Sequence, residues 1–487
     1  MPRLAGLGGD NRRVMRDTPT HTPPGRRFRL RNVGLGGVLI ALSVAVLAGL
    51  WLKTQPDVLH GFKAACAEGD WHGQQYSRLC YSDIVPLLST EELGDYDPST
   101  PGTQHRLPYL DPCKGTQNCD EYPVLSMYLM RLAAWTSSGY GGFLLANVFW
   151  LAVAAGITAV CLYLIAGPRA LWFALAPTLV IYGFMNWDLL AVAFATAATL
   201  AFLRRRDVTS GVLLGLGAAA KLYPALLVIP FAVHRFRERE PDRGIHLTWA
   251  AAGTWVAVNL PFAVVGFHGW SEFFRFNAKR PADFDSLWYI GCHLAGRDGC
   301  VNGGLFPSEW PVLAGIQAAT AFSAAAFVAG AALVWLLRSR VRPEFSRWTL
   351  CLPVVILFLV TNKVYSPQYG LWLLPLFVLV LPPLGPLRPL TLFALFEITD
   401  VAVFVTRFTW FHTLPPFSGW GAPFWAFESA VLARAAVLVL CLVAWVRGPE
   451  PALTGPAMLG QESAPVPGRR RVAVTLPPVP AAPEAGT

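Results

Sequence analysis

The sequence has little charge for its length. Only 14% of its 487 residues are Asp, Glu, Lys or Arg, and 54% are hydrophobic, whereas an ordinary soluble domain is about 25% charged. Apolar runs of about 15 to 25 residues recur from Val33 to Val446, each long enough to cross ~30 Å of hydrocarbon. A soluble core would not repeat this pattern so often. The sequence therefore predicts an all-α polytopic membrane protein.

The sequence also lacks recognisable nucleotide and metal motifs. It contains no Gly-rich phosphate loop, and no nucleotide-sugar site is expected. Two carboxylate pairs, Asp95-Tyr96-Asp97 and Glu68-Gly69-Asp70, have the spacing with which soluble sugar transferases hold a metal–nucleotide complex. A metal needs several converging oxygen ligands, and no full set is visible. Solvated loops are the simpler interpretation of both pairs, and dependence on a divalent metal stays open. The loop histidines show no ligand spacing: His60, His72, His105, His268, His293 and His412.

Acidic residues are the scarcer charge, with 30 Asp and Glu against 39 Lys and Arg. Eight Arg precede Val33, and further clusters lie at Arg204-Arg205-Arg206, Arg235 to Arg243 and Arg338 to Arg347. All of them fall in the leader or in short connections, as the positive-inside rule predicts for cytoplasmic segments. The excess of basic residues therefore indicates how the chain is oriented in the membrane and does not indicate nucleic-acid binding.

The chain divides into three parts by composition. Residues 1–32 predict a disordered basic cytoplasmic leader, residues 33–447 a transmembrane domain, and residues 448–487 a Pro/Ala-rich disordered cytoplasmic tail. The first span is expected to be an uncleaved anchor, because its apolar run is too long for a signal peptide. It is followed by a long outer loop, residues 53–140, with 11 acidic and 6 basic residues. A second outer loop covers residues 268–310.

The number of helices depends on one ambiguous run. Gly211 to Val233 lies between two basic loops, so a single crossing would violate the charge rule. We expect two short helices, broken near Lys221-Leu222-Tyr223-Pro224. With Leu171 to Phe184 taken as one crossing, this gives about 12 transmembrane helices in a plasma-membrane protein with both termini cytoplasmic.

The nine cysteines fall into two groups. Cys161, Cys351 and Cys441 lie inside apolar helices and are expected to be small core residues. The other six lie in predicted outer loops, where an even number suggests disulfides: Cys66, Cys80, Cys113, Cys119, Cys292 and Cys300. Bonds between Cys113 and Cys119 and between Cys292 and Cys300 would close the shortest loops. The sequence does not determine which cysteines pair, and six unpaired thiols are the alternative.

Charged residues near the ends of membrane helices are costly, so each is a functional candidate. Six of them map to the predicted outer face: Asp83, Asp188, Lys221, Lys279, Arg280 and Lys363. A carboxylate among cations suits a general base beside a bound anion such as a phosphate. Simpler interpretations stay open, because Asp83 and Asp188 could each be a helix N-cap and Lys221 could extend to the lipid interface.

Five motifs together resemble one enzyme family: Tyr81-Ser82-Asp83, Glu121-Tyr122-Pro123, Asn186-Trp187-Asp188, Lys221-Leu222-Tyr223-Pro224 and Asn362-Lys363-Val364-Tyr365-Ser366-Pro367-Gln368-Tyr369. Their order and placement are similar to those of glycosyltransferase family 87, over roughly Val33 to Val446. This family includes polyprenol-phosphate-mannose-dependent mannosyltransferases of the GT-C fold, a bundle of membrane helices with a long first outer loop.

The resemblance implies transfer of a hexose, mannose as the first candidate, from a polyprenyl-phosphate donor to a lipid or cell-envelope acceptor. It also implies inversion at the sugar and an active site on the extracytoplasmic face. Asp83 matches the catalytic base, and Lys221 and Lys363 match positions near the donor phosphate. The other substrate-binding candidates are Asn186, Asp188, Glu121, Tyr122, Tyr365, Gln368, Lys279 and Arg280. No metal ligand is implied.

Two other classes are compatible with this many helices. A secondary transporter or lipid flippase would often show two matching halves, whereas only the first half of this chain has an 88-residue outer loop. A non-catalytic envelope scaffold would need the outer loops only as binding surfaces. The loop asymmetry favours the enzyme.

Overall fold

The computed structural model describes residues 33–57, 63–67, 72–94, 106–113, 119–294 and 315–458, with side chains from residue 320 in the last range. The predictions for the leader, for the tail beyond Met458, for Asp95-Tyr96-Asp97, for Glu68-Gly69-Asp70 and for Cys300 lie outside these residues.

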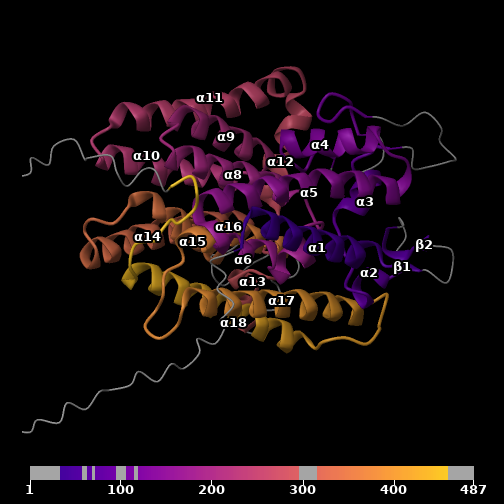
Figure 1. The fold of residues 1–487 in the computed structure, drawn as a ribbon. Coiled ribbons are helices and arrows are strands. Elements are labelled where there is room, and N and C mark those ends of the chain that lie inside the picture. Colours follow the sequence, from indigo (N-terminus) through magenta and orange to yellow (C-terminus); the bar gives the residue numbers. More distant parts are fainter. Residues whose placement is uncertain are drawn as a thin grey trace, which may run out of the picture.

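The protein is a bundle in which long helices run in one common direction (Figure 1). Within the described residues, six helical segments are long and apolar enough to cross a membrane. They are α1 (Leu35–Thr54), α5 (Gly139–Ala166) continued by η3 (Gly167–Ala170) and α6 (Leu171–Ala174), α11 (Pro241–Val265), α14 (Gly315–Val341), α17 (Pro389–Thr413) and α18 (Phe424–Arg447). The chain is a multi-pass membrane protein.

Shorter helices complete the bundle. They are α4 (Val124–Trp135), α7 (Pro177–Tyr182), α8 (Asp188–Leu203), α9 (Asp207–Ala220), α10 (Val228–Arg237), η6 (Arg347–Leu350) with α15 (Cys351–Thr361), and η7 (Pro367–Tyr369) with α16 (Gly370–Val380). Because these helices are shorter than a full span, the predicted count of 12 is not confirmed. The run from Leu171 to Phe184 shows why: it splits into α6 and α7, and Pro177 begins the second piece.

Helix α9 packs closely against α11 because glycines remove side chains from the contact. A Cβ atom on Gly215 would lie 2.5 Å from the carbonyl oxygen of Ala251, and one on Gly211 would overlap the carbonyl oxygen of Leu247. Small residues four apart allow such close backbone approach between membrane helices. The α9–α11 contact therefore depends on this pair of glycines.

The predicted break at Lys221 is confirmed. Helix α9 ends at Ala220, Lys221 is extended (φ −156°, ψ 139°), and a 3₁₀ turn, η4 (Tyr223–Leu227), precedes α10. Pro224 suits the start of this turn, since it has no N–H to donate to an α-helical ladder. The break leaves Lys221 outside the regular part of both helices.

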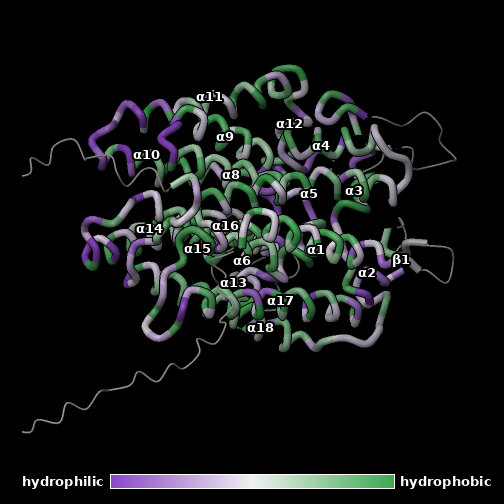
Figure 2. Tube along the Cα trace, in the orientation of Figure 1, coloured by the Kyte–Doolittle hydropathy of each residue, from purple (hydrophilic) through white to green (hydrophobic). Residues whose placement is uncertain are grey.

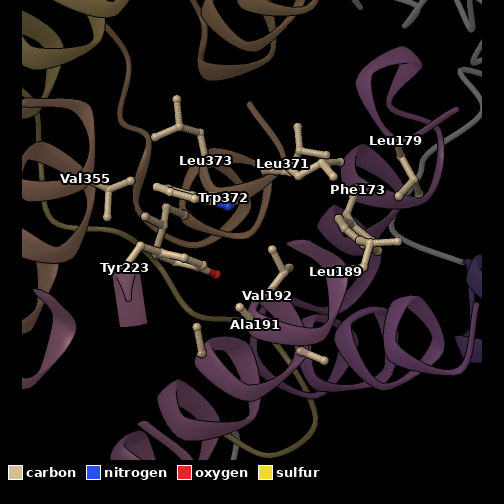
Figure 3. Packing of buried hydrophobic residues seen from close by; sticks show 14 of the residues in the cluster. Phe173, Leu179, Leu189, Ala191, Val192, Tyr223, Val355, Leu371, Trp372 and Leu373 are labelled. Atoms are coloured by element: carbon tan, nitrogen blue, oxygen red, sulfur yellow. The ribbon is translucent and has the colours of Figure 1, made fainter. Parts of the chain in front are cut away.

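An aromatic stack lies beside this break, in the core of the bundle (Figure 3). The ring of Tyr223 stacks on Trp372 at 4.4 Å between centroids, and Tyr369 stacks on Trp372 at 4.0 Å. Leu189 and Val192 from α8 are fully buried in the same cluster. The stack joins η4 to α16 and gives the residues above it a rigid base.

The bundle has two polar ends (Figure 2). At the end we call the basic end, residues 204–207 and 237–243, Asp207 pairs with Arg235 at 2.8 Å and with Arg243 at 2.6 Å. The opposite end, the loop end, carries the remaining short elements: β1 (Pro56–Asp57) paired with β2 (Lys63–Ala64), η2 (Ala65–Ala67), α2 (Gln74–Ser77), α3 (Ile84–Thr90), α12 (Phe267–Lys279) and α13 (Leu287–Leu294).

The ordered chain extends beyond the predicted domain boundary at Gly448. The backbone N–H groups of Gly455 and Ala457 donate to the carbonyl oxygens of Ile165 and Leu164, each at 2.9 Å. Glu450 also pairs with the buried Arg338 at 2.7 Å. Residues up to Met458 therefore correct the prediction of a tail that is disordered from residue 448, since these contacts satisfy carbonyl groups at the end of α5.

The two ends should lie on opposite sides of the membrane. Single cysteines replacing the exposed Arg78, before α3, and Trp420, between α17 and α18, should react with an impermeant maleimide from one side. A cysteine replacing the exposed Arg237 should react only from the other. The unmodified protein is the control, because its described free cysteines are buried. Labelling of all three positions from one side would contradict this arrangement.

Candidate functional site

A small pocket of about 210 Å³ opens at the loop end, above the break at Lys221. It is built by six separate stretches of the chain. Its lining residues are Asp83, Glu121, Tyr122, Pro123, Asn186, Lys221, Phe273, Phe276, Asn277, Arg280, Ser366, Gln368 and Tyr369. Seven of the predicted site residues meet here, although they lie far apart in the sequence.

Asp83 is held at the pocket by its side chain and its backbone. The Tyr81 hydroxyl donates to one carboxylate oxygen at 2.7 Å, and the Asn186 amide donates to the other at 2.8 Å. The Asp83 N–H donates to the carbonyl oxygen of Met185 at 2.8 Å. Asp83 precedes α3, but its side chain makes no capping hydrogen bond. The N-cap interpretation is therefore wrong, and the carboxylate is directed to the pocket.

Lys53 supports the loop that carries Asp83. It was not among the predicted site residues. It is fully buried in the last turn of α1, and its ammonium donates to the carbonyl oxygen of Tyr81 at 2.6 Å. A cation at the end of an apolar span is a signal the sequence does contain. The signal was missed because terminal lysines usually extend toward the lipid interface.

Lys221 and Asp188 form a buried ion pair at the base of the pocket. The Lys221 ammonium lies 3.2 Å from Asp188, whose other oxygen accepts from the Trp372 indole N–H at 2.6 Å. The ammonium also faces the rings of Tyr369 and Tyr122, at 5.3 and 5.6 Å from their centroids. Asp188 is thus a charge partner and not a helix cap, and Lys221 does not extend into lipid.

Glu121 and Tyr122 form the side of the pocket next to α4. The Tyr122 hydroxyl accepts from the Asn186 amide at 2.9 Å. Burial raises the pKa of the Glu121 carboxyl to about 7, and the charge of Asp83 adds to this effect while Arg280 and Lys221 oppose it. The charge of the pocket therefore changes near neutral pH.

A buried charge cluster in the first outer loop fixes the position of Glu121. Arg106 pairs with Asp120 at 2.8 Å and with Glu91 at 3.3 Å, and Glu91 accepts from the N–H of Asp120 at 2.6 Å. One cation with two carboxylates is balanced when one carboxyl holds a proton. Burial raises the pKa of Glu91 to about 8, which agrees with this assignment. The cluster was not predicted, since its members are spread over the acidic loop.

Disulfides close the same loop. Cys66 is bonded to Cys80 and Cys113 to Cys119, and Cys292 is disulfide-bonded as well. Cys80 lies three residues before Asp83. The Cys66–Cys80 bond therefore ties the loop that carries Asp83 to the segment that follows α1.

Three predicted substrate-binding residues lie away from the pocket. Lys363 donates to the carbonyl oxygen of Ala278 at 3.2 Å, and Tyr365 is buried beneath the Arg434 guanidinium, 3.9 Å from its ring centroid. Ser366 is extended, so its side chain and that of Tyr365 face opposite ways. Ser366 reaches the pocket, as does Gln368 from the 3₁₀ turn η7, whereas Lys363 and Tyr365 do not. Lys279 lines a neighbouring, larger cavity.

A second unpredicted cluster supports this extended segment. Asp283 accepts from the Ser366 hydroxyl and from Arg280, both at 3.3 Å. Arg407 pairs with Asp283 at 3.1 Å and also with Asp285. Although burial opposes it, Arg407 and Arg280 hold the pKa of Asp283 below its usual range. A charged residue inside the apolar run of α17 was the available signal.

Among the residues that the structure describes, no three His, Cys, Asp or Glu side chains are placed to hold a metal ion. The two carboxylate pairs considered from the sequence lie outside those residues. The pocket residues themselves can hold an anion, through Lys221 and Arg280, and can accept a proton, through Asp83.

Comparison with known proteins gives one family match. The model described as glycosyltransferase family 87 matches residues 121–362, while no curated protein matches the chain. Among solved structures, ArnT from Cupriavidus metallidurans bound to undecaprenyl phosphate is 13% identical with a TM-score of 0.41, over 85% of this chain and 77% of that chain. The apo oligosaccharyltransferase from Archaeoglobus fulgidus is 11% identical with a TM-score of 0.34, over 85% of this chain and 56% of that chain.

The matched range includes most of the pocket. Glu121, Asn186, Lys221 and Arg280 lie within it, whereas Asp83 precedes it. Over residues 121–362, just under half of its length, the chain matches glycosyltransferase family 87.

Proposed function

We propose that this protein transfers a hexose, with mannose as the first candidate, from a polyprenyl-phosphate donor to a lipid or cell-envelope acceptor. The reaction would take place at the loop end, on the extracytoplasmic face of the plasma membrane, with both termini cytoplasmic. The match to glycosyltransferase family 87 over residues 121–362 supports the transferase class. The GT-C bundle type, the sugar and the orientation are part of the proposal.

The placement of Asp83 carries this proposal. A general base must lie within hydrogen-bond reach of the hydroxyl it deprotonates. Asp83 faces a pocket of single-sugar size, and the hydrogen bonds from Tyr81 and Asn186 fix its carboxylate. Two cations, Lys221 and Arg280, line the same pocket.

The chemistry is a single displacement. Asp83 takes the proton of an acceptor hydroxyl, whose oxygen attacks the anomeric carbon of the donor sugar. The bond from that carbon to the phosphate oxygen breaks, and polyprenyl phosphate leaves with the electron pair. Lys221 and Arg280 stabilise the negative charge that develops on the leaving phosphate, as fixed cations do in a site with little water.

The surroundings of the pocket suit a lipid-linked donor. A mostly apolar crevice of about 10 Å³ adjoins it, sharing Tyr122, Pro123 and Phe273, and is lined further by Val124, Ala218, Leu222, Trp255 and Phe274. Leu222 is exposed on the outer surface of the bundle. The crevice is too narrow for a polyprenyl chain in this structure, so the proposal requires these side chains to move apart when the donor binds, while the sugar phosphate stays near Lys221.

Replacing Asp83 tests the assignment directly. Asp83→Asn keeps the size of the side chain but removes the base, so sugar transfer from labelled polyprenyl-phosphate mannose should fall by about 10²-fold or more. Asp242→Asn removes an exposed carboxylate at the basic end and should leave transfer unchanged. Full transfer by Asp83→Asn at normal protein levels would exclude Asp83 as the base. Accumulation of substrate in proteoliposomes without any covalent product would favour a transporter.

Glu121 should make donor binding pH-dependent. Its raised pKa of about 7 means that the carboxyl is neutral below that pH and anionic above it. A negative Glu121 repels the donor phosphate, so the KM for the donor should rise by about 3- to 10-fold between about pH 6 and about pH 8. In Glu121→Gln the KM should stay flat over this range. The same rise in the variant would assign the effect to another group.

A further inference from the structure

A larger cavity of about 940 Å³ adjoins the pocket and shares Phe276 and Arg280 with it. Its other lining residues are His268, Glu272, Arg275, Lys279, Pro281, Ala282, Asp283, Phe284 and Arg407. A third cavity, of about 490 Å³, shares His268, Glu272 and Arg275 with the second and continues along residues 109–113, 119 and 120. The third cavity adds the carboxylates Asp111 and Asp120, so the name α12 trough is kept for the second cavity, of about 940 Å³.

One face of α12 lines the trough. His268, Glu272, Arg275, Phe276 and Lys279 follow the i, i+4, i+7, i+8, i+11 spacing that places residues on one side of a helix. The opposite face carries Trp270, Phe273 and Phe274, which line the apolar crevice. Helix α12 therefore lies between the apolar crevice on one side and the polar trough on the other.

The side chains that line the α12 trough carry an excess of positive charge. Four cationic side chains and two carboxylates line the 940 Å³ cavity. Three of the cations have carboxylate partners: Arg275 pairs with Glu272 at 2.6 Å, Arg280 with Asp283 at 3.3 Å, and Arg407 with Asp283 at 3.1 Å. Within the described part of the chain, Lys279 has no carboxylate in ion-pair range, and its side chain is exposed. An anion entering the cavity would supply the missing partner.

We infer that the α12 trough binds the acceptor, and that the acceptor carries an anionic group, a phosphate ester or a carboxylate, which Lys279 and Arg275 recognise. The inference rests on the proposed function, because only a transferase needs a second substrate beside the donor. The lipid chain of the donor is expected on the apolar side of α12, where the narrow crevice lies, so the polar trough remains for the acceptor. Its volume exceeds that of the catalytic pocket, and the acceptor therefore extends well beyond the hydroxyl that reacts.

Three soluble probes isolate the charge: methyl glucoside, methyl glucuronide and methyl glucoside 6-phosphate share one ring and differ only at C6. Their dissociation constants for the full chain in nanodiscs can be measured by saturation-transfer NMR. We expect at least one charged probe to bind about tenfold more tightly than the neutral one, because charge-assisted hydrogen bonds are the stronger kind. High salt should reduce the difference. Whichever charged probe binds more tightly shows whether the site prefers a phosphate or a carboxylate.

Substitutions test which basic side chains cause the preference for charged probes. Lys279→Gln should bring the charged and neutral probes to within about threefold of each other, and Lys279→Arg should keep most of the preference. Lys279 is exposed and makes no contact that folding requires, so these variants should fold normally. Arg78→Gln is the matched control, since it removes an exposed cation elsewhere at the loop end. Equal binding of all three probes to the unmodified protein, or a preference that survives in Lys279→Gln combined with Arg275→Gln, would overturn the inference.

The transfer assay separates this inference from the proposed function. Transfer of sugar from the polyprenyl-phosphate donor without any preference among the probes would overturn only the acceptor inference. A charge preference without transfer to any acceptor would overturn the acceptor role together with the proposed function.

Discussion

The site depends on a buried ion pair at a broken helix. A charged side chain at bilayer depth costs about 2.5–3.5 kcal/mol on insertion scales, so Lys221 can remain there only with a partner. Asp188 supplies it at 3.2 Å, and Trp372 holds Asp188 by a hydrogen bond at 2.6 Å. The pair and Trp372 join the start of α8, the end of α9 and α16, and α16 is far from the other two in the sequence. Everything else in the pocket is arranged above it.

The outer segments are fixed above this base by polar contacts as well as by apolar packing, since Ile84, Val85 and Leu88 of α3 are buried in the core. Lys53 holds the Tyr81 carbonyl, and Asn186 contacts Asp83 and Tyr122 at once. Asn186 lies only two residues before Asp188, so the Asp83 carboxylate and the buried ion pair are positioned by one short connection. This rigidity matters for the proposed reaction, because a general base and a fixed cation stabilise a transition state only when both are already in place.

The sequence predicted the features that depend on local rules. The break at Lys221 follows from charge topology and Pro224. Asp83 and Asp188 are candidates because they are charged and lie near helix ends, whereas Asn186 is expected only from the family resemblance. Features set by long-range contact were not accessible in the same way. Asp283 meets Arg407 across a separation of 124 residues, and no local pattern pairs them. The side on which Lys363 and Tyr365 point depends on the conformation of the segment that carries them. The helix count of 12 is not confirmed, because apolar length does not reveal the interruption between α6 and α7.

The stereochemistry of the product tests the central claim most directly. A single carboxylate base and direct displacement at the anomeric carbon require inversion of the donor's configuration. NMR of the product formed from a donor labelled with ¹³C at the anomeric carbon, read through the one-bond carbon–proton coupling, measures this outcome. The account predicts the inverted anomer as the sole product. Retention of configuration, or a sugar covalently attached to Asp83, would contradict it.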